Sequence, residues 1–301
     1  MNPMLVVGSV AFDTLHIAGQ THEKVLGGSA TYASIAASNF TGVQLVGVVG
    51  RDFPDSAVKM LTEKKVDMQG LEVVDGETFH WEGRYHEDFS SRETIRTDLN
   101  VFADFQPKIP STFRNAPYVM LGNIDPTLQM QVLEQIERPK LVLVDTMNLW
   151  IDIRYDALIE LLKKVDFLVL NDEEARQLTG KHGLVECGRD LQSRGPKRVI
   201  IKKGEHGALL FDGAEELLSL PALPLNEVAD PTGAGDSFAG ALLGYLAQQD
   251  NLRPETIRKA VVYGTVVASF CVEGVSTQRL EGATEAEIRS RFEWMQRLVK
   301  F

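Results

Sequence analysis

The segment 230-DPTGAGDSFAG-240 combines residue types that could bind and transfer a charged group. Gly233 and Gly235 let the backbone adopt conformations that other residues avoid. The run that follows, 236-DSFAGALLGYLAQ-248, has the pattern of a helix. A glycine turn entering a helix directs several backbone N–H groups at one point, and the helix dipole adds about half a positive charge there. Such a turn suits a phosphoryl group, which carries negative charge during transfer.

Asp236 places a carboxylate at the start of the same helix. If the carboxylate and the turn both contacted one phosphate, the two negative charges would repel each other. The carboxylate is useful if it faces a second substrate and accepts the proton of a hydroxyl group, because the alcohol oxygen can then attack the bound phosphoryl group. An aspartate that only caps an ordinary helix would give the same local sequence. The turn alone leaves both interpretations open.

The composition limits the class of protein. The 301 residues are 44% apolar and carry a net charge of −11, which suits a globular domain and argues against a nucleic-acid-binding surface. No apolar run approaches the roughly 18 residues of a membrane span, and the N-terminal segment lacks the features of a secretory signal. Cys187 and Cys271 have no metal-like spacing and predict no disulfide framework. We therefore expect a cytoplasmic protein that binds neither membranes nor nucleic acids.

Short apolar runs alternate with helical patterns along most of the chain. The runs are nearly continuous in apolar residues, as expected for strands covered on both faces. They lie at 4–10, 43–50, 117–121, 140–145, 165–171, 197–204 and 207–211. Helix starts are marked by Asp125 followed by Pro126, and by Thr284 with Glu287 three residues later. The repeated alternation predicts an α/β fold, with a mostly parallel sheet and helices on both faces.

The region 78–102 departs from this pattern because its residues are aromatic, charged and prone to form strands. Residues 79–87 and 92–97 predict two strands joined by a turn at Ser90–Ser91. Together with residues 11–19 they would form a small sheet outside the main core. Such a sheet is either a lid over a site or a contact between subunits.

No internal repeat, low-complexity tract or linker divides the chain into independent parts. We therefore expect one domain over residues 1–301, with a lid formed by about 11–26 and 78–100. The aromatic residues of this lid make a homodimer through it an alternative to a cover over the site.

The segment DPTGAGDSFAG resembles the C-terminal signature of the ribokinase-like (PfkB) carbohydrate and nucleoside kinases. Other segments agree with that family in the expected order. They are 7-VGSVAFDTL-15, the pair Gly27-Gly28 before 29–40, 46-VGVVGRDF-53, 171-NDEEARQLTG-180 and 201-IKKGEHGALLF-211. The resemblance covers essentially the whole chain. It implies a doubly wound αβα sandwich with a β-sheet lid, and transfer of the γ-phosphate of ATP to a hydroxyl group of a small molecule.

The resemblance also implies roles for the glycine turn and its surroundings. Asp236 would be the base, and the amides of Gly233, Ala234 and Gly235 would form the anion hole. Asp230 and Thr232 would belong, with backbone from 272–276, to the monovalent-cation site that many members of the family have. The cofactors implied are therefore ATP and Mg²⁺, with K⁺ as an additional one in those members.

Two further motifs are implied to face the nucleotide. Asn171 and Glu174 match the family's Asn-x-x-Glu motif and would organise Mg²⁺ through its waters. Capping of the helix that follows is an alternative role for Asn171. Lys203, Gly204 and Gly207 would edge the nucleotide pocket, or form a plain turn between strands. The chain has no Walker A run and no GxGxxG after its first strand.

The acceptor is expected between the first strand, the Gly27-Gly28 turn and the lid. The Asp13 carboxylate could accept hydrogen bonds from two sugar hydroxyls, although a residue that merely ends a strand would look the same. Gly27 and Gly28 allow the backbone to approach a ligand closely. Asn123, after the strand at 117–121, is a further candidate at the rim of the pocket.

The chain departs from well-known sugar kinases at two of these positions. Ser29 stands where ribokinases typically carry lysine, and Tyr32 stands where many sugar kinases carry asparagine. Both changes alter the size and hydrogen bonding of the pocket, so ribose, fructose or a gluconate is not to be assumed as the substrate.

The lid contributes further candidates. Strand alternation places Arg84 and His86 on one face, and Trp81 and Tyr85 on the other. One face could cover a sugar or stack on a base, and an aromatic contact between subunits is an equal alternative.

We therefore expect an ATP-dependent kinase whose acceptor is a small sugar or sugar-like molecule, with a nucleoside kinase as the alternative. A protein that only senses sugars or nucleosides would be expected to lack the base or the anion hole, and both are present in the sequence. An oxidoreductase on a doubly wound sheet would need the dinucleotide fingerprint that the chain lacks.

Overall fold

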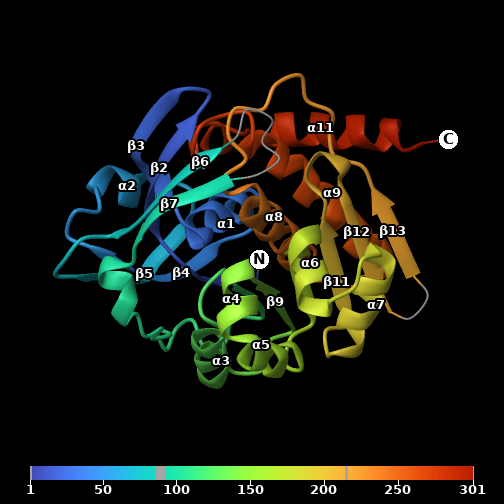
Figure 1. Cartoon of the computed structure of the whole chain (residues 1–301), viewed down its shortest axis with the longest axis horizontal. Helices are drawn as coiled ribbons and strands as arrows, with labels where there is room; N and C mark the ends of the chain where they lie inside the picture. The colour runs from blue at the N-terminus through green and yellow to red at the C-terminus, as the bar shows by residue number, and fades with distance from the viewer. Residues whose placement is uncertain (1, 86–91, 214–215, 301) are drawn as a thin grey trace.

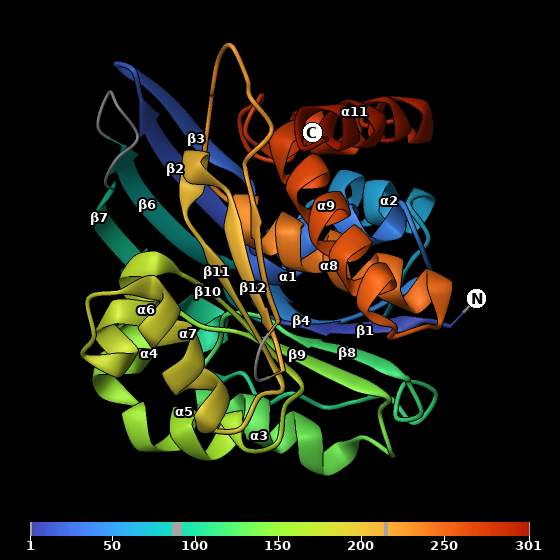
Figure 2. The same ribbon diagram turned by 90° about the vertical axis from the view of Figure 1, so that its right-hand side faces the viewer.

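The computed structural model describes residues 2–85, 92–213 and 216–300. Within these residues the chain forms a large sheet of nine strands in the order β13-β12-β11-β10-β9-β8-β1-β4-β5 (Figures 1 and 2). The strands are β1 (Met4–Val7), β4 (Val43–Gly50), β5 (Val66–Val74), β8 (Tyr118–Leu121), β9 (Leu141–Asp145), β10 (Phe167–Asn171), β11 (Arg198–Lys202), β12 (Ala208–Asp212) and β13 (Glu216–Leu220).

The sheet is mostly parallel, as predicted. The strands in the order β11-β10-β9-β8-β1-β4-β5 all run parallel to their neighbours. Within this sheet only the β11–β12 and β12–β13 pairs are antiparallel. The seven predicted strands are confirmed within a few residues. The edge strands β5 and β13 were not predicted, because neither has a continuous apolar run.

Helices cover both faces of the sheet, which confirms the predicted doubly wound αβα sandwich (Figure 2). One layer holds α1 (Ser29–Ser38), α2 (Asp55–Glu63), α8 (Ala234–Gln249), α9 (Pro254–Cys271), α10 (Gln278–Glu281) and α11 (Glu285–Leu298). The other holds α3 (Pro126–Gln135), α4 (Asn148–Ile153), α5 (Tyr155–Leu162), α6 (Asp172–Thr179) and α7 (Leu184–Ser193). Two short 3-10 helices, η1 (Asn100–Asp104) and η2 (Gly204–His206), lie in loops. No helix in the described ranges is long and apolar enough to cross a membrane.

Strand β1 illustrates why two apolar layers are needed. Met4 and Val6 belong to the core under α1, α8 and α9, whereas Leu5 and Val7 belong to the core on the opposite face. Successive side chains of a strand point to opposite faces, so a strand covered on both faces must be apolar throughout.

Local sequence signals fix the helix starts. The Asp125 side chain accepts a hydrogen bond from the Thr127 N–H, with Pro126 at the first helical position of α3. Thr284 and Glu287 form the predicted capping box at the start of α11.

The predicted small sheet is present as four strands in the order β3-β2-β6-β7 (Figure 1). Its strands are β2 (Ala11–Ile17), β3 (Gln20–Gly27), β6 (Phe79–Tyr85) and β7 (Arg92–Asp98). The turn predicted at Ser90–Ser91 and the residue His86 lie outside the described residues. We refer to this sheet as the lid.

Helices α1 and α8 pack with their backbones in close approach. A Cβ atom added to Gly240 would lie 2.3 Å from the Ala33 carbonyl oxygen, and one added to Gly244 would lie 2.9 Å from the Ala37 Cα. Because the obstructing atoms are backbone, they cannot rotate away. This contact fixes α8, and with it the turn that precedes α8, against the rest of the core.

We predict that Gly240→Ala lowers the free energy of unfolding by about 1–3 kcal/mol, because the new methyl group forces α1 and α8 apart. Helix propensity alone predicts the opposite, a gain of about 1 kcal/mol. Urea unfolding decides the sign. The control is Gly42→Ala, since a Cβ there meets no atom within 4 Å. A stabilised Gly240→Ala protein would show that the two helices are not in backbone contact.

Candidate active site

Three neighbouring parallel strands end in polar residues at one edge of the sheet. Asp145, Asn171 and Lys202 are the last residues of β9, β10 and β11. Lys202 pairs with Asn171 across β10–β11, and Asp145 pairs with Val169 across β9–β10. In open α/β sheets, ligands bind outside the carboxyl ends of the strands. This edge is therefore where a substrate site is expected.

The start of α8 shows why glycine is required in the 230–236 turn. Gly233 is the N-cap of α8 and has a φ of +74°, in the left-handed region. A Cβ at this position would lie 2.3 Å from the ring of Tyr32. Glycine cannot cap the helix with a side chain, so the first N–H groups of α8 have no side-chain partner from their N-cap. Asp236 follows in the first turn of the helix.

Gly235 lies next to a charged side chain. A Cβ on Gly235 would lie 2.7 Å from the Nζ atom of Lys202. The ammonium group of Lys202 therefore lies against the 230–236 turn, at Gly235. The neighbouring Lys203, predicted to edge the nucleotide pocket, donates its backbone N–H to the Gly207 carbonyl at 2.7 Å. No motif in the sequence pointed to Lys202.

Lys202 is surrounded by carboxylates from three elements. Its Nζ lies 3.6 Å from the Asp145 Oδ1, and the two side chains are only 19% and 6% exposed. Burial acts to lower the pKa of Lys202, but the charges of Asp145, Glu174 and Asp236 outweigh it and raise that pKa. Burial raises the pKa of Asp145, and Lys202 opposes this rise. At neutral pH the lysine is an ammonium ion.

Asp230 ties the turn to the segment after α9. Its Oδ1 accepts a hydrogen bond from the Thr232 N–H and its Oδ2 accepts one from the Ser276 N–H, both at 2.9 Å. The side chain is fully buried, and burial raises its pKa although these hydrogen bonds oppose the rise. Within the described residues no ion pair involves Asp230. This carboxylate is one of the two side chains that the family resemblance assigns to a monovalent-cation site.

Thr232 connects the turn to the lid. Its hydroxyl lies 2.9 Å from the hydroxyl of Tyr85, at the end of β6. The Cys271 thiol donates to the Thr232 carbonyl at 3.2 Å. Burial raises the pKa of Cys271 to about 12, so it stays a thiol. Cys187 and Cys271 are both free and buried.

Asn171 and Glu174 form a capping box at the start of α6. The Asn171 Oδ1 accepts from the Glu174 N–H at 2.8 Å, and the Glu174 Oε2 accepts from the Asn171 N–H at 2.7 Å. The alternative role that the sequence offered for Asn171 is therefore present. No group of three or more acidic, histidine or cysteine side chains able to hold a metal occurs in the described ranges. These two residues fit Mg²⁺ that arrives with its waters on a phosphate group, and not a dedicated metal cage.

The expected acceptor residues lie where the lid joins the core. Asp13 is buried, and a Cβ on Gly27 would lie 2.1 Å from its Oδ2. The glycine thus makes room for the carboxylate. A Cβ on Gly28, which has a φ of +94°, would lie 2.5 Å from the Ser9 carbonyl oxygen. The Ser29 N–H donates to the Ser9 hydroxyl at 3.0 Å, and the Ser29 hydroxyl accepts from the Ser9 N–H at 3.2 Å.

Two other candidates, Tyr32 and Asn123, contact other parts of the protein. The Tyr32 side chain is 1% exposed and its ring lies beneath Gly233. Asn123 accepts a hydrogen bond from Trp150 at 2.8 Å and donates to the Met147 sulfur at 3.1 Å. Both partners come from the segment after β9, a contact that the sequence did not reveal.

The two faces of the lid differ as strand alternation predicted. Trp81 lies opposite Asp13 in the β2–β6 pairing, so both point to the same face, where Trp81 and Tyr85 join a small apolar cluster. Arg84 points to the other face, is 57% exposed and lies 3.5 Å from Glu93. That face also bounds a polar cavity of about 280 Å³.

The Gly204–Gly207 turn joins β11 to β12 through η2. Gly207 has a φ of +83°, and a Cβ there would lie 2.0 Å from the Leu220 carbonyl oxygen of β13. Gly207 thus has a structural role in the antiparallel edge, beside any contact with a nucleotide.

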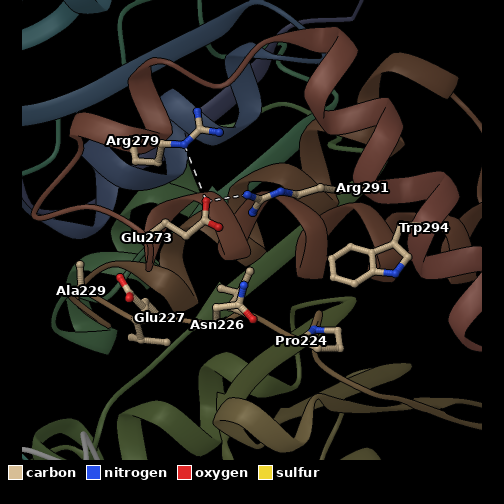
Figure 3. A pocket seen from close by; sticks show the side chains of 10 residues that line it. Pro224, Asn226, Glu227, Ala229, Glu273, Arg279, Arg291 and Trp294 are labelled. Atoms are coloured by element: carbon tan, nitrogen blue, oxygen red, sulfur yellow. Dashed lines mark hydrogen bonds and ion pairs between the residues drawn. The ribbon is translucent and has the colours of Figure 1, made fainter.

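A cavity of about 690 Å³ lies between residues 224–229 and the α10–α11 region. Figure 3 shows Glu273 between Arg279 and Arg291, with Trp294 along the wall. The Glu273 Oε2 lies 2.5 Å from Arg291 and 3.7 Å from Arg279, and both guanidinium groups lie over the Phe270 ring. This network holds the loop whose Ser276 N–H binds Asp230.

Known proteins resemble the chain in sequence and in fold. Residues 3–282 match the pfkB family of carbohydrate kinases. The cytidine kinase of Thermococcus kodakarensis is 32% identical over 84% of this chain and 91% of its own length. The nucleoside kinase of Methanocaldococcus jannaschii is 23% identical over 82% and 81%. The fructokinase of Vibrio cholerae superposes with a TM-score of 0.81 at 19% identity, covering 97% of this chain and 99% of that one.

The fold and the site define a ribokinase-like kinase, with a glycine turn, an aspartate at a helix start and a β-sheet lid. The chain belongs to the pfkB carbohydrate kinase family.

The capping box provides a direct test of the local structure. Asn171→Ala should lower the free energy of unfolding by about 1 kcal/mol, because the Glu174 N–H loses its acceptor. Asn171→Ser keeps a capping hydroxyl and should recover most of that loss. Urea unfolding of the three proteins measures both effects. Equal losses in the two variants would contradict a capping role.

Proposed function

We propose that the protein transfers the γ-phosphate of ATP to a hydroxyl group of a nucleoside or a related sugar, with Asp236 as the base. The observation that carries the proposal is the start of α8. There the left-handed Gly233 directs uncapped N–H groups and Asp236 to the carboxyl edge of the sheet. An anion turn and a proton acceptor on one helical turn meet the two requirements of phosphoryl transfer to an alcohol.

The reaction can be followed atom by atom. The Asp236 carboxylate takes the proton of the acceptor hydroxyl, and the alcohol oxygen forms a bond to the γ-phosphorus. The bond from the γ-phosphorus to the oxygen bridging the β- and γ-phosphates breaks, and ADP leaves with its electron pair. The amides of Gly233, Ala234 and Gly235 stabilise the charge on the transferring group. In the present conformation the Ala234 N–H donates to the Pro231 carbonyl at 3.3 Å, a long bond that an incoming oxyanion can replace.

The cations of the reaction fit the residues around the turn. Mg²⁺ neutralises phosphate charge, and Asn171 and Glu174 would hold it through water while they cap α6. Asp230 would hold K⁺ beneath the turn, where its buried carboxylate has no ion-pair partner among the described residues. Lys203, Gly204 and Gly207 would border the nucleotide.

A nucleoside is favoured over a free sugar for two reasons. The relative that matches 84% of the chain at 32% identity is a cytidine kinase. In addition, Trp81 faces the same side of the lid as Asp13, and its ring covers Gly83. Asp13 can accept two ribose hydroxyls, while an aromatic ring on the lid can stack on a base. Arg84 lies on the opposite face of the lid and would reach an acceptor only if the lid rearranged.

The acceptor class is tested by ADP release from ATP and Mg²⁺ with nucleosides, pentoses, hexoses and sugar acids. We expect kcat/KM to be higher for nucleosides than for free sugars, and higher in K⁺ than in Na⁺. A preference for a free sugar would exclude the nucleoside assignment. Absence of transfer to every compound would contradict the kinase proposal itself.

Asp236→Asn tests the role of the base. The variant should bind both substrates within a few-fold of the native protein, while kcat falls by about 10²–10⁴, because only the proton acceptor is removed. Asp156→Asn is a matched control, since Asp156 lies in the first turn of α5 and is exposed. Turnover of Asp236→Asn within a few-fold of native would rule out Asp236 as the base.

A further inference from the structure

We propose that the ammonium group of Lys202 binds the phosphoryl group during its transfer, and that Asp145 positions it. The inference rests on the proposed kinase function and adds to it a charged side chain that the glycine turn does not supply. It assigns Lys202, at the end of β11, a contact with the oxygens of the γ-phosphate and of the β–γ bridge.

The position of Lys202 is the first argument. A Cβ on Gly235 would lie 2.7 Å from the Lys202 Nζ, so the ammonium occupies the space that a side chain at 235 would need. Gly235 does not have the left-handed φ of Gly233. The backbone at 235 would therefore accept a side chain, but that side chain would push the end of Lys202 away from the turn. An anion held by the turn amides would lie beside this ammonium.

The charges around Lys202 are the second argument. One carboxylate is enough to form a structural ion pair with a lysine, and the Asp145 Oδ1 already lies 3.6 Å from the Lys202 Nζ. Glu174 from α6 and Asp236 from α8 also act on Lys202 electrostatically. These two residues belong to the expected magnesium and base positions. Lys202 is therefore the positive charge that the separate parts of the active site share.

In the transfer step Lys202 keeps its proton and donates hydrogen bonds. As the bond to the bridging oxygen breaks, negative charge grows on that oxygen and on the oxygens of the transferring group. A fixed ammonium in a partly buried site stabilises this charge better than water does. The proton of the acceptor hydroxyl still goes to Asp236, and Lys202 neither gains nor loses a proton.

Asp145 acts through Lys202. Its Oδ1 also accepts the Thr146 N–H at 3.0 Å, which fixes the carboxylate at the end of β9. The carboxylate lies 3.6 Å from the Lys202 Nζ and both side chains are largely buried, so it orients the ammonium group from one side. The loss of Asp145 should therefore matter only as long as Lys202 is present.

The first experiment measures the affinity of the native protein and three variants for the β,γ-imido analogue of ATP with Mg²⁺, and for adenosine. Lys202→Met should weaken analogue binding by about 10- to 100-fold, because a charge-assisted hydrogen bond is lost. Adenosine binding should stay within about threefold, since adenosine has no phosphate. Lys197→Met is the control, because Lys197 lies just before the other end of β11 and is 76% exposed. Lys202→Arg should restore part of the affinity.

Two results would overturn the proposal. One is analogue binding by Lys202→Met within about threefold of native, and the other is an equal loss for analogue and adenosine, which indicates a structural role. If Lys202→Met does not fold, Lys202→Gln replaces it, because glutamine keeps a polar group at the site and removes the charge. Native-like analogue binding by Lys202→Gln would then overturn the proposal, and a loss confined to the analogue would support it.

The second experiment combines Asp145→Asn with Lys202→Met and measures analogue affinity. We expect Asp145→Asn to weaken analogue binding in the otherwise native protein, and to change it by less than about threefold in the Lys202→Met protein, because Asp145 acts only through Lys202. An equal further loss in the Lys202→Met protein would remove Asp145 from the proposal. Analogue binding needs no acceptor, so it separates the two hypotheses. Lys202-dependent binding without transfer would contradict only the kinase function, and transfer unaffected by Lys202→Met would contradict only the role of Lys202.

Discussion

The candidate active site depends on holding the start of α8 at the carboxyl edge of the parallel strands. Two buried contacts achieve this. Gly240 brings the backbone of α8 against α1, and the buried Asp230 carboxylate joins the turn before α8 to the Ser276 N–H. The first contact is a close approach of two backbones, and the second uses both oxygens of the Asp230 carboxylate. A displacement of α8 relative to α1 would therefore cause a steric clash or break a hydrogen bond. The N–H groups of the turn are thereby placed before any substrate arrives, which is what electrostatic stabilisation of a transition state requires.

Much of the fold was predictable because its signals are local. Continuous apolar runs identified the buried strands, and caps such as Thr284 with Glu287 identified helix starts. The edge strands β5 and β13 were not predicted, because a strand at the edge of a sheet buries side chains along only part of one face. In β13, whose pattern is mostly exposed, Leu220 is buried and Leu217 is 40% exposed.

The site was predictable where one segment carries both the chemistry and the backbone geometry, as in the 230–236 turn. It was not predictable where a contact joins distant segments. Lys202 and Lys203 are adjacent in sequence, and only the register of β11 with β10 and the packing of α8 place Lys202 at Gly235. In the same way, Tyr32 occupies a position expected to line the pocket. The structure instead buries its ring under Gly233, which no rule based on Tyr32 alone would indicate.

The balance of charge at this edge explains why cations must accompany the nucleotide. Asp145, Glu174 and Asp236 surround Lys202, so the described cluster carries three carboxylates and one ammonium. A nucleotide triphosphate brings several more negative charges into a partly buried space, where like charges repel more strongly than in water. One ammonium and a helix dipole of about half a charge cannot offset that sum. In the proposed reaction a divalent ion on the phosphates would reduce this excess of negative charge beside Asp236, the residue proposed to accept the proton of the attacking hydroxyl.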